Sequence, residues 1–130
     1  MKIILINLLL IIAFISCNTS EEFPPAENAL DAAREYVDGT LKGEFKKSEA
    51  YLLKSQNNKA QLDKLKQHYY QFNDIQRQNY RKASIIIERE NNISDKESVI
   101  YFQNSFDKQK DSVTVIQQDG LWLVNFEERE

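Results

Sequence analysis

The feature that most constrains this chain is the pair Asp119-Gly120 near its carboxyl end. Alternating apolar and polar residues flank the pair, and Asp-Gly readily adopts the two positive φ values that a type I′ turn requires. We therefore predict two antiparallel strands within residues 111–126, with Val115 paired to Val124. One face of this hairpin carries the apolar side chains Val113, Val115, Trp122, Val124 and Phe126. We expect a helical layer to cover that face.

Two further strands are predicted upstream of the hairpin. Residues 82–89 contain three consecutive isoleucines, and β-branched residues favour strands. Residues 97–106 alternate between two faces, with Val99 and Tyr101 on one, and Ile100, Phe102 and Phe106 on the other. The polar stretches 90–96 and 107–110 are predicted turns. Together these segments form a four-stranded antiparallel meander.

Three helices are predicted before the strands. Residues 26–41 form an amphipathic pattern, and Gly39 and Gly43 are expected to break the helix near its end. Residues 44–53 form a shorter candidate, and the turn 55–58 offers helix-capping side chains. The longest candidate is Lys59–Tyr80, and its apolar stripe consists of Leu62, Leu65, Tyr69, Phe72 and Ile75. We expect this stripe to cover the hairpin face.

The segregation of helices from strands predicts an α+β domain of two layers. With 130 residues, the chain suits one domain, here residues 26–130. Its 42% hydrophobic and 28% charged residues are ordinary for a globular protein. A net charge of −3 gives no electrostatic footprint for nucleic acid, so a nucleic-acid partner is not expected.

The amino-terminal residues predict a targeting signal and a membrane anchor. Residues 3–15 form an apolar run of about 20 Å as a helix, which is short of a membrane core of about 30 Å. A signal peptide over residues 1–17 therefore fits better than a permanent span. The segment Phe14-Ile-Ser-Cys17 resembles the lipobox of bacterial lipoproteins, with Phe14 in place of the usual leucine. This resemblance implies that Cys17 is lipidated, and an ordinary secretory signal is the alternative.

The segment that follows the cysteine is a predicted tether. Residues 18–25 are polar and acidic and end in Pro24-Pro25, which disfavours a helix. The triplet Ser20-Glu21-Glu22 also resembles an acidic export signal of surface lipoproteins, although a merely solvated tether explains it equally well. We therefore expect the protein in the bacterial cell envelope, on the outer membrane, facing either the periplasm or the surface.

The order of elements resembles a known family. The segments that carry the resemblance are Gly43–Lys47, Tyr80–Ile87 and Gln118–Val124. They resemble the small NTF2-like (cystatin-like) domains of bacterial lipoproteins, and in particular the uncharacterised DUF4878 group. The resemblance implies a curved sheet wrapped around the long helix as a cone with a cavity. It implies no single activity, because members of such families include enzymes and binding modules.

The sequence carries no clear catalytic pattern. His68 is the single histidine, and it has neither a cysteine partner nor metal-ligand spacing. A phosphate-binding glycine loop and a nucleophile elbow are both missing, so no cofactor and no metal are expected. Some NTF2-like enzymes pair an aspartate base with a tyrosine acid. Asp31 or Asp38 could play that part beside Tyr36, Tyr69 or Tyr101, but no spacing requires it.

Three functions remain open at this stage. A non-catalytic module would bind a small apolar ligand or a protein, with Tyr36, Tyr69, Tyr101 and Trp122 lining the cavity. The same aromatic residues could instead simply fill the core. A small isomerase or dehydratase is the enzymatic alternative. An assembly subunit could form a homodimer through an apolar patch on the outer sheet face, comprising Ile100, Phe102, Ile116 and Leu123.

Overall fold

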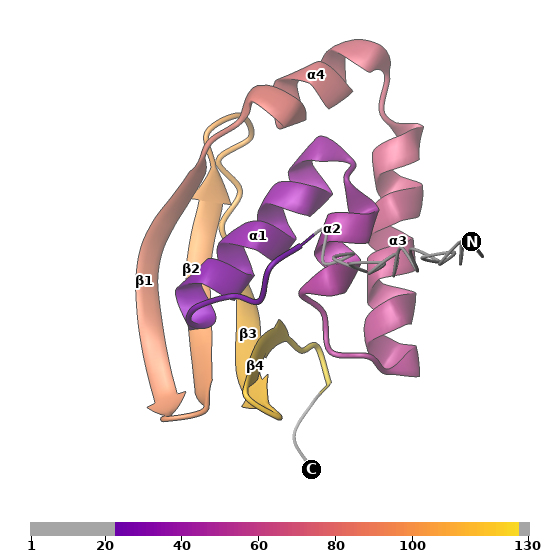
Figure 1. Ribbon diagram of the computed structural model, residues 1–130. Coiled ribbons are helices and arrows are strands. Elements are labelled where there is room, and N and C mark those ends of the chain that lie inside the picture. The colour runs from indigo at the N-terminus through magenta and orange to yellow at the C-terminus, as the bar shows by residue number, and fades with distance from the viewer. Residues whose placement is uncertain (1–22, 128–130) are drawn as a thin grey trace, which may run out of the picture.

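The computed structural model describes residues 23–127 as an α+β domain in which helices precede an antiparallel sheet (Figure 1). The helices are α1 (Ala29–Lys42), α2 (Phe45–Ala50), α3 (Gln56–Gln71) and α4 (Asp74–Lys82). The strands are β1 (Ile85–Ser94), β2 (Glu97–Asn104), β3 (Asp111–Gln118) and β4 (Leu121–Val124), and they lie in the order β1-β2-β3-β4. The predicted α+β class and the predicted four-stranded antiparallel meander are confirmed.

The hairpin of β3 and β4 forms as predicted. Asp119 and Gly120 both have positive φ, at 51° and 77°. Val115 pairs with Val124, which is the register that the turn was expected to impose. Val113, Val115 and Val124 are buried, while Trp122 and Phe126 pack at the edge of the core. The predicted core face of the hairpin is therefore correct.

The helix that covers this face is α1, not the long helix that the sequence predicted. Helix α1 packs against all four strands, whereas α3 packs against α2. Figure 1 shows α1 between the sheet and α3, so that α3 forms an outer layer. The physical reason lies in Ala29, Ala32 and Ala33, whose buried small side chains let α1 lie close to the sheet. In the stripe of α3, Leu62 and Tyr69 are buried, but Leu65 remains exposed.

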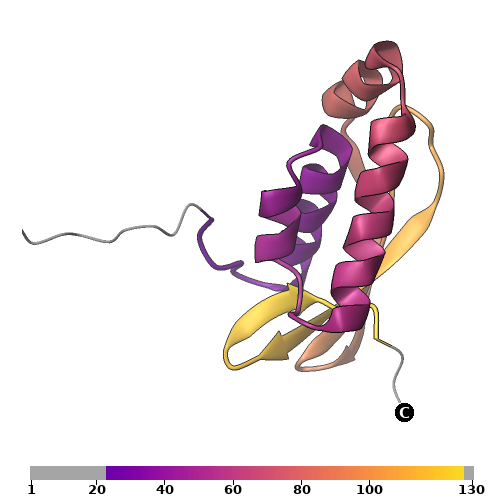
Figure 2. The ribbon, with the colours of Figure 1, turned by 90° about the vertical axis from the view of Figure 1, so that its right-hand side faces the viewer.

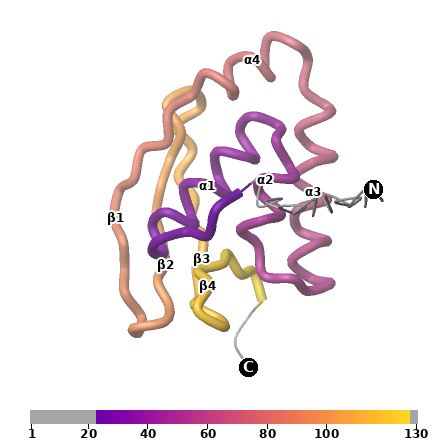
Figure 3. Tube along the Cα trace, viewed as in Figure 1, coloured from indigo at the N-terminus to yellow at the C-terminus, as the bar shows by residue number. Residues whose placement is uncertain are grey.

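The predicted helix Lys59–Tyr80 is in fact two helices. Helix α3 ends at Gln71, and Phe72 and Asn73 separate it from α4. Figure 3 shows the chain changing direction between the two helices. Asn73 forms a capping box, in which its side chain accepts from the Gln76 amide while the Gln76 side chain accepts from the Asn73 amide. This box begins a new helix, and it leaves Ile75, the last residue of the predicted stripe, 71% exposed.

Other boundaries shift by a few residues. Helix α1 starts after Asn28, whose side chain accepts a hydrogen bond from the Asp31 amide at 2.8 Å. Gly43 ends α1 in the left-handed region as expected, but Gly39 lies buried inside the helix. Strand β1 runs on to Ser94, so that most of the predicted turn 90–96 is strand.

The predicted apolar patch on the outer sheet face does not exist in that form. Ile100 and Phe102 are buried, and they point into the core from β2 together with Ser98 and Asn104. The alternation along β2 was read correctly, but its two faces were assigned to the wrong sides. Ile116 and Leu123 are only partly exposed. The dimer surface deduced from the sequence therefore loses half of its members.

The two edges of the sheet differ. The β4 edge is covered, because the Leu53 amide donates to the Val124 carbonyl and the Val124 amide donates to the Tyr51 carbonyl. The opposite edge is β1, whose pairing with β2 shifts register between Ile87 and Arg89 and again between Asn92 and Ser94. These shifts are bulges in an edge strand.

The predictions for the amino end lie outside the described residues. They include the signal peptide 1–17, the lipidation of Cys17 and most of the tether. At the start of the described chain, the Tyr51 hydroxyl donates to the Pro24 carbonyl at 2.7 Å. Within residues 23–127, the helices are all too short or too polar to cross a membrane.

Candidate functional site

A cleft of about 350 Å³ lies between the helices and the sheet. Side chains from α1, α3 and Tyr80 of α4 form one side, and β2, the connection to β3 and the start of β3 form the other. In Figure 2, α3 lies with α1 on one side and the β2–β3 connection on the other. The volume falls within the range of small-molecule sites.

Aromatic side chains form much of the cleft wall. Phe72 and Tyr80 stack with their ring centroids 4.9 Å apart and their planes at 20°. Tyr36 on α1 meets Phe126 at 5.7 Å. Tyr69 lines the same cleft from α3, one helical turn before the capping box. The break between α3 and α4 thus creates part of the site, because it folds Tyr80 back onto Phe72.

Tyr36 has a hydroxyl group without a partner. The residue is 2% exposed, and its Oη accepts or donates no hydrogen bond within the described chain. Burial, followed by the negative charge of Asp111, raises the pKa of Tyr36 well above its ordinary value. The hydroxyl therefore stays neutral, and it remains an unused hydrogen-bonding group, buried at the end of a side chain that lines the cleft.

One end of the cleft is acidic. Asp107 accepts hydrogen bonds from the Tyr80 hydroxyl at 3.0 Å and from the Asn104 side-chain amide at 2.8 Å. Burial, and then the hydrogen bond to Asp107, raises the pKa of Tyr80. Asp111 also lines the cleft, and its Oδ1 accepts from the Ser112 amide at 2.7 Å. The site thus combines an aromatic wall with two carboxylates.

The structure separates the four aromatic residues that were predicted to line a cavity. Tyr36 and Tyr69 line the cleft together. Trp122 is partly buried against the core and is not among the cleft residues. Tyr101 points to the other face of the sheet, because it alternates with the buried Ile100 and Phe102.

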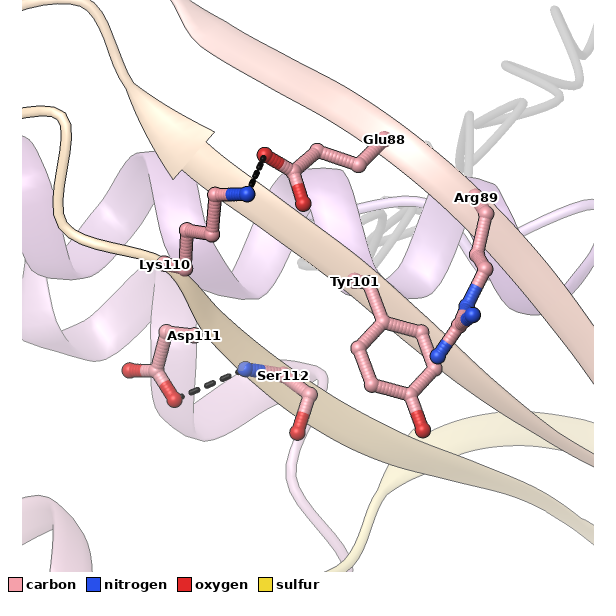
Figure 4. Close-up of a pocket in the computed structure, with 6 residues that line it drawn as sticks. All are labelled: Glu88, Arg89, Tyr101, Lys110, Asp111 and Ser112. Atoms are coloured by element: carbon pink, nitrogen blue, oxygen red, sulfur yellow. Dashed lines mark hydrogen bonds and ion pairs between the residues drawn. The ribbon is translucent and has the colours of Figure 1, made fainter.

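Tyr101 lines a separate, more open groove of about 520 Å³ on the outer face (Figure 4). The guanidinium carbon of Arg89 lies 4.1 Å from the centroid of the Tyr101 ring, which is a cation–π contact. Lys110 forms a long ion pair with Glu88 at 3.8 Å in the same groove. These contacts engage Arg89, Lys110 and Glu88, whereas Asp111 and Ser112 line this groove as well as the cleft.

The aspartates proposed for an enzyme lie away from the cleft. Asp31 accepts from the Glu27 amide at the start of α1. Burial alone would raise the pKa of Asp38, but hydrogen bonds and charges from Lys47 and Lys42 lower it overall. Its ion pairs with Lys47 and Lys42 measure 2.8 and 2.9 Å. Asp38 is thus a structural anion rather than a general base with a raised pKa.

Several cleft residues were missed by the sequence analysis. Asp107 and Asp111 were assigned to a turn and to a strand end, and Tyr80 was placed at the end of a single long helix. The Asn104–Asp107 segment does carry a signal, since the Asn104 side chain accepts from the amides of Phe106 and Asp107 in a local turn. His68 is exposed on α3, where it packs on Phe72 and reaches the cleft.

Between residues 23 and 127, no cluster of His, Cys, Asp and Glu could hold a metal ion. Comparison with known proteins gives no match, since no family model, no curated protein and no solved structure resembles the chain closely enough to count. The site is therefore interpreted from its own geometry.

Proposed function

We propose that this chain is a membrane-anchored lipoprotein whose domain, of NTF2-like type, binds a small and largely apolar ligand without catalysis. The observation that carries the proposal is the cleft of about 350 Å³, with its aromatic wall and the unpartnered hydroxyl of Tyr36. Apolar walls with a few convergent polar groups are typical of ligand sites. The helices in front of an antiparallel sheet are compatible with an NTF2-like cone.

The arrangement of the titratable groups favours binding over catalysis. A general base needs a free carboxylate or imidazole within reach of a proton donor on the substrate. Asp107 accepts from Tyr80, Asn104 and the Gln109 amide, so its oxygens are already occupied. Asp38, the aspartate considered first, is paired with two lysines. An isomerase that uses Asp38 and Tyr36 is therefore the weaker proposal.

Binding in the cleft can be tested with an uncharged fluorescent probe, N-phenyl-1-naphthylamine. Leu65 lines the cleft and is 42% exposed, so a Leu65→Arg variant is expected to fold normally. The arginine places a charged, hydrated group at the cleft and should weaken probe binding about tenfold, or about 1.4 kcal/mol. A fluorescence titration of the full chain measures the affinity.

The matched control is Leu121→Arg. Leu121 is 43% exposed on β4 and does not line the cleft, so this variant adds the same charge to the same kind of surface. Its probe affinity should equal that of the unmodified chain. Equal weakening by both substitutions, or no saturable binding to the unmodified chain, would count against a ligand site in the cleft.

The proposed anchor has its own test. Replacing Cys17 by alanine removes the thiol that would receive the lipid, so the protein should no longer incorporate labelled palmitate. It should also leave the membrane fraction, because each buried CH₂ of an acyl chain contributes about 0.8 kcal/mol to membrane binding. Palmitate labelling of bacteria that express each form decides the matter. Labelling that persists in the Cys17→Ala variant would refute lipidation at this residue.

A further inference from the structure

The charges around the cleft are unbalanced. Three charged side chains line it, namely Asp107, Asp111 and Lys110. Lys110 forms its ion pair with Glu88, on the outer face of the sheet (Figure 4). The Asp107 carboxylate is satisfied by neutral donors. Within the described residues, neither aspartate forms a direct ion pair with a cation that lines the cleft.

Asp111 has an oxygen to spare. Its Oδ1 accepts from the Ser112 amide, and its Oδ2 accepts from no residue between 23 and 127. Two arginines of α4 contact Tyr69, since Arg81 donates to the Tyr69 hydroxyl at 3.1 Å and Arg77 lies over the Tyr69 ring. Neither arginine lines the cleft. Asp111 is thus available to a positively charged ligand.

The hydroxyl of Tyr36 is an independent indication of a ligand. It is buried and unpartnered, and a group in that state costs free energy until it is satisfied. The charge of Asp111 acts on the same hydroxyl and helps to raise its pKa, so the two groups are electrostatically coupled. A neutral hydroxyl keeps its lone pairs and can accept a hydrogen bond from a ligand N–H.

The aromatic wall suits a cation as well as an apolar body. The faces of aromatic rings attract ammonium groups, most strongly where water is excluded. We propose that the ligand of this cleft is a protonated amine attached to an apolar group about the size of an aromatic ring system. Its N–H groups donate to Asp111 and Tyr36, and its body packs against Phe72 and Phe102. This inference rests on the proposed function and adds the charge of the ligand.

The test compares three probes that share a naphthyl body. They are 2-naphthylmethylammonium, the neutral 2-naphthylmethanol and the anionic 2-naphthoate, titrated into the full chain while the amide signals of Tyr80 and Val113 are followed by NMR. The ammonium should bind about fivefold tighter than the alcohol, the size of one partly screened ion pair, and naphthoate should bind weakest. Raising the salt from about 0.05 M to about 0.5 M should reduce both the advantage of the ammonium and the disadvantage of naphthoate, while the affinity for the alcohol stays unchanged.

Two variants locate the effect. Asp111→Asn keeps an acceptor for the Ser112 amide and should remove the advantage of the ammonium, while the affinity for the alcohol stays unchanged. Asp95→Asn, in the exposed turn after β1, makes the same change in charge away from the cleft and should alter nothing. Tyr36→Phe should weaken the binding of the ammonium probe by a further two- to threefold, which is about the contribution of one hydrogen bond.

The outcomes separate the two proposals. If the alcohol binds at the cleft and the ammonium binds no tighter, the inference is wrong while the ligand site stands. If none of the three probes shifts the Tyr80 and Val113 signals, both proposals fail. An unchanged ammonium preference in Asp111→Asn would also overturn the inference, since the carboxylate would then play no part.

Discussion

Replacing Asn58 by leucine is expected to destabilise the domain by about 3 kcal/mol, although the two side chains have the same branched arrangement of heavy atoms. Asn58 is fully buried at the start of α3. Its side-chain amide donates to the Leu53 carbonyl and to Asn125 Oδ1, both at 3.0 Å, and its Oδ1 accepts from the Phe126 amide at 2.8 Å. Leucine leaves the Leu53 carbonyl and the Phe126 amide, both partly buried, without their Asn58 partner.

The neighbouring residue supplies the control. Asn57 lies in the same helical turn but is exposed, so Asn57→Leu should change the free energy of unfolding by less than about 0.5 kcal/mol. Urea unfolding followed by circular dichroism measures both variants. If Asn58→Leu were as stable as Asn57→Leu, the hydrogen bonds of Asn58 would not hold the start of α3 to Leu53 and to the carboxyl-terminal residues Asn125 and Phe126 in the way described.

Replacing Gly43 by alanine is expected to cost at least about 2 kcal/mol, for two separate reasons. Gly43 has a φ of 72°, a conformation that residues with a Cβ rarely adopt. A Cβ at this position would also lie 2.6 Å from Cζ of the buried Tyr69 ring. The ring must move to relieve the clash, and it forms part of the cleft wall. Probe binding should therefore weaken together with stability.

Gly120→Ala separates the two costs. Gly120 has a φ of 77°, close to that of Gly43, but a Cβ there would meet nothing within 4 Å. Its substitution should cost about 1 kcal/mol through the backbone alone and leave probe binding intact. The excess cost at Gly43, measured by urea unfolding, is then the contribution of the Tyr69 contact. An equal loss of stability at both glycines would show that the Tyr69 ring moves aside without a measurable cost in free energy.

The parts of the fold that could be predicted are those fixed by local chemistry. The Asp119-Gly120 turn determines its own pairing, and alternation then identifies the buried face of β3 and β4. The order of helices before strands gives the α+β class. None of these steps depends on which distant segments meet, so the sequence alone was sufficient.

The choice of covering helix required knowledge of distant contacts. The stripe of Lys59–Tyr80 is longer and contains larger apolar residues than that of α1, so hydrophobicity favoured the wrong helix. The helix that packs on the sheet is instead the one that can lie closest to it, and the small alanine side chains of α1 permit this close approach. The capping box at Asn73 was visible as Asn-x-x-Gln, but the helix-forming residues around it masked the break.

The cleft was the least predictable part, because it is assembled from three helices, two strands and the segments between them. Tyr36 and Tyr69 were named from the expectation of an aromatic cavity, and they lie together in the cleft. Asp107 and Asp111 belong to a connection and a strand end, where charged residues are ordinary. Their approach to Tyr36 depends on how the β2–β3 connection folds over the helices, and no spacing in the sequence encodes that.

The two register shifts in β1 affect how readily copies of the domain could join edge to edge at high concentration. An extended chain that joins the free side of a sheet needs peptide groups at regular intervals along its whole length. On β1 that regularity is interrupted after Ile87 and again after Asn92, which leaves only short uniform runs. The opposite side is occupied by the Tyr51–Leu53 segment. Copies of this domain packed side by side should therefore resist stacking into a continuous fibre.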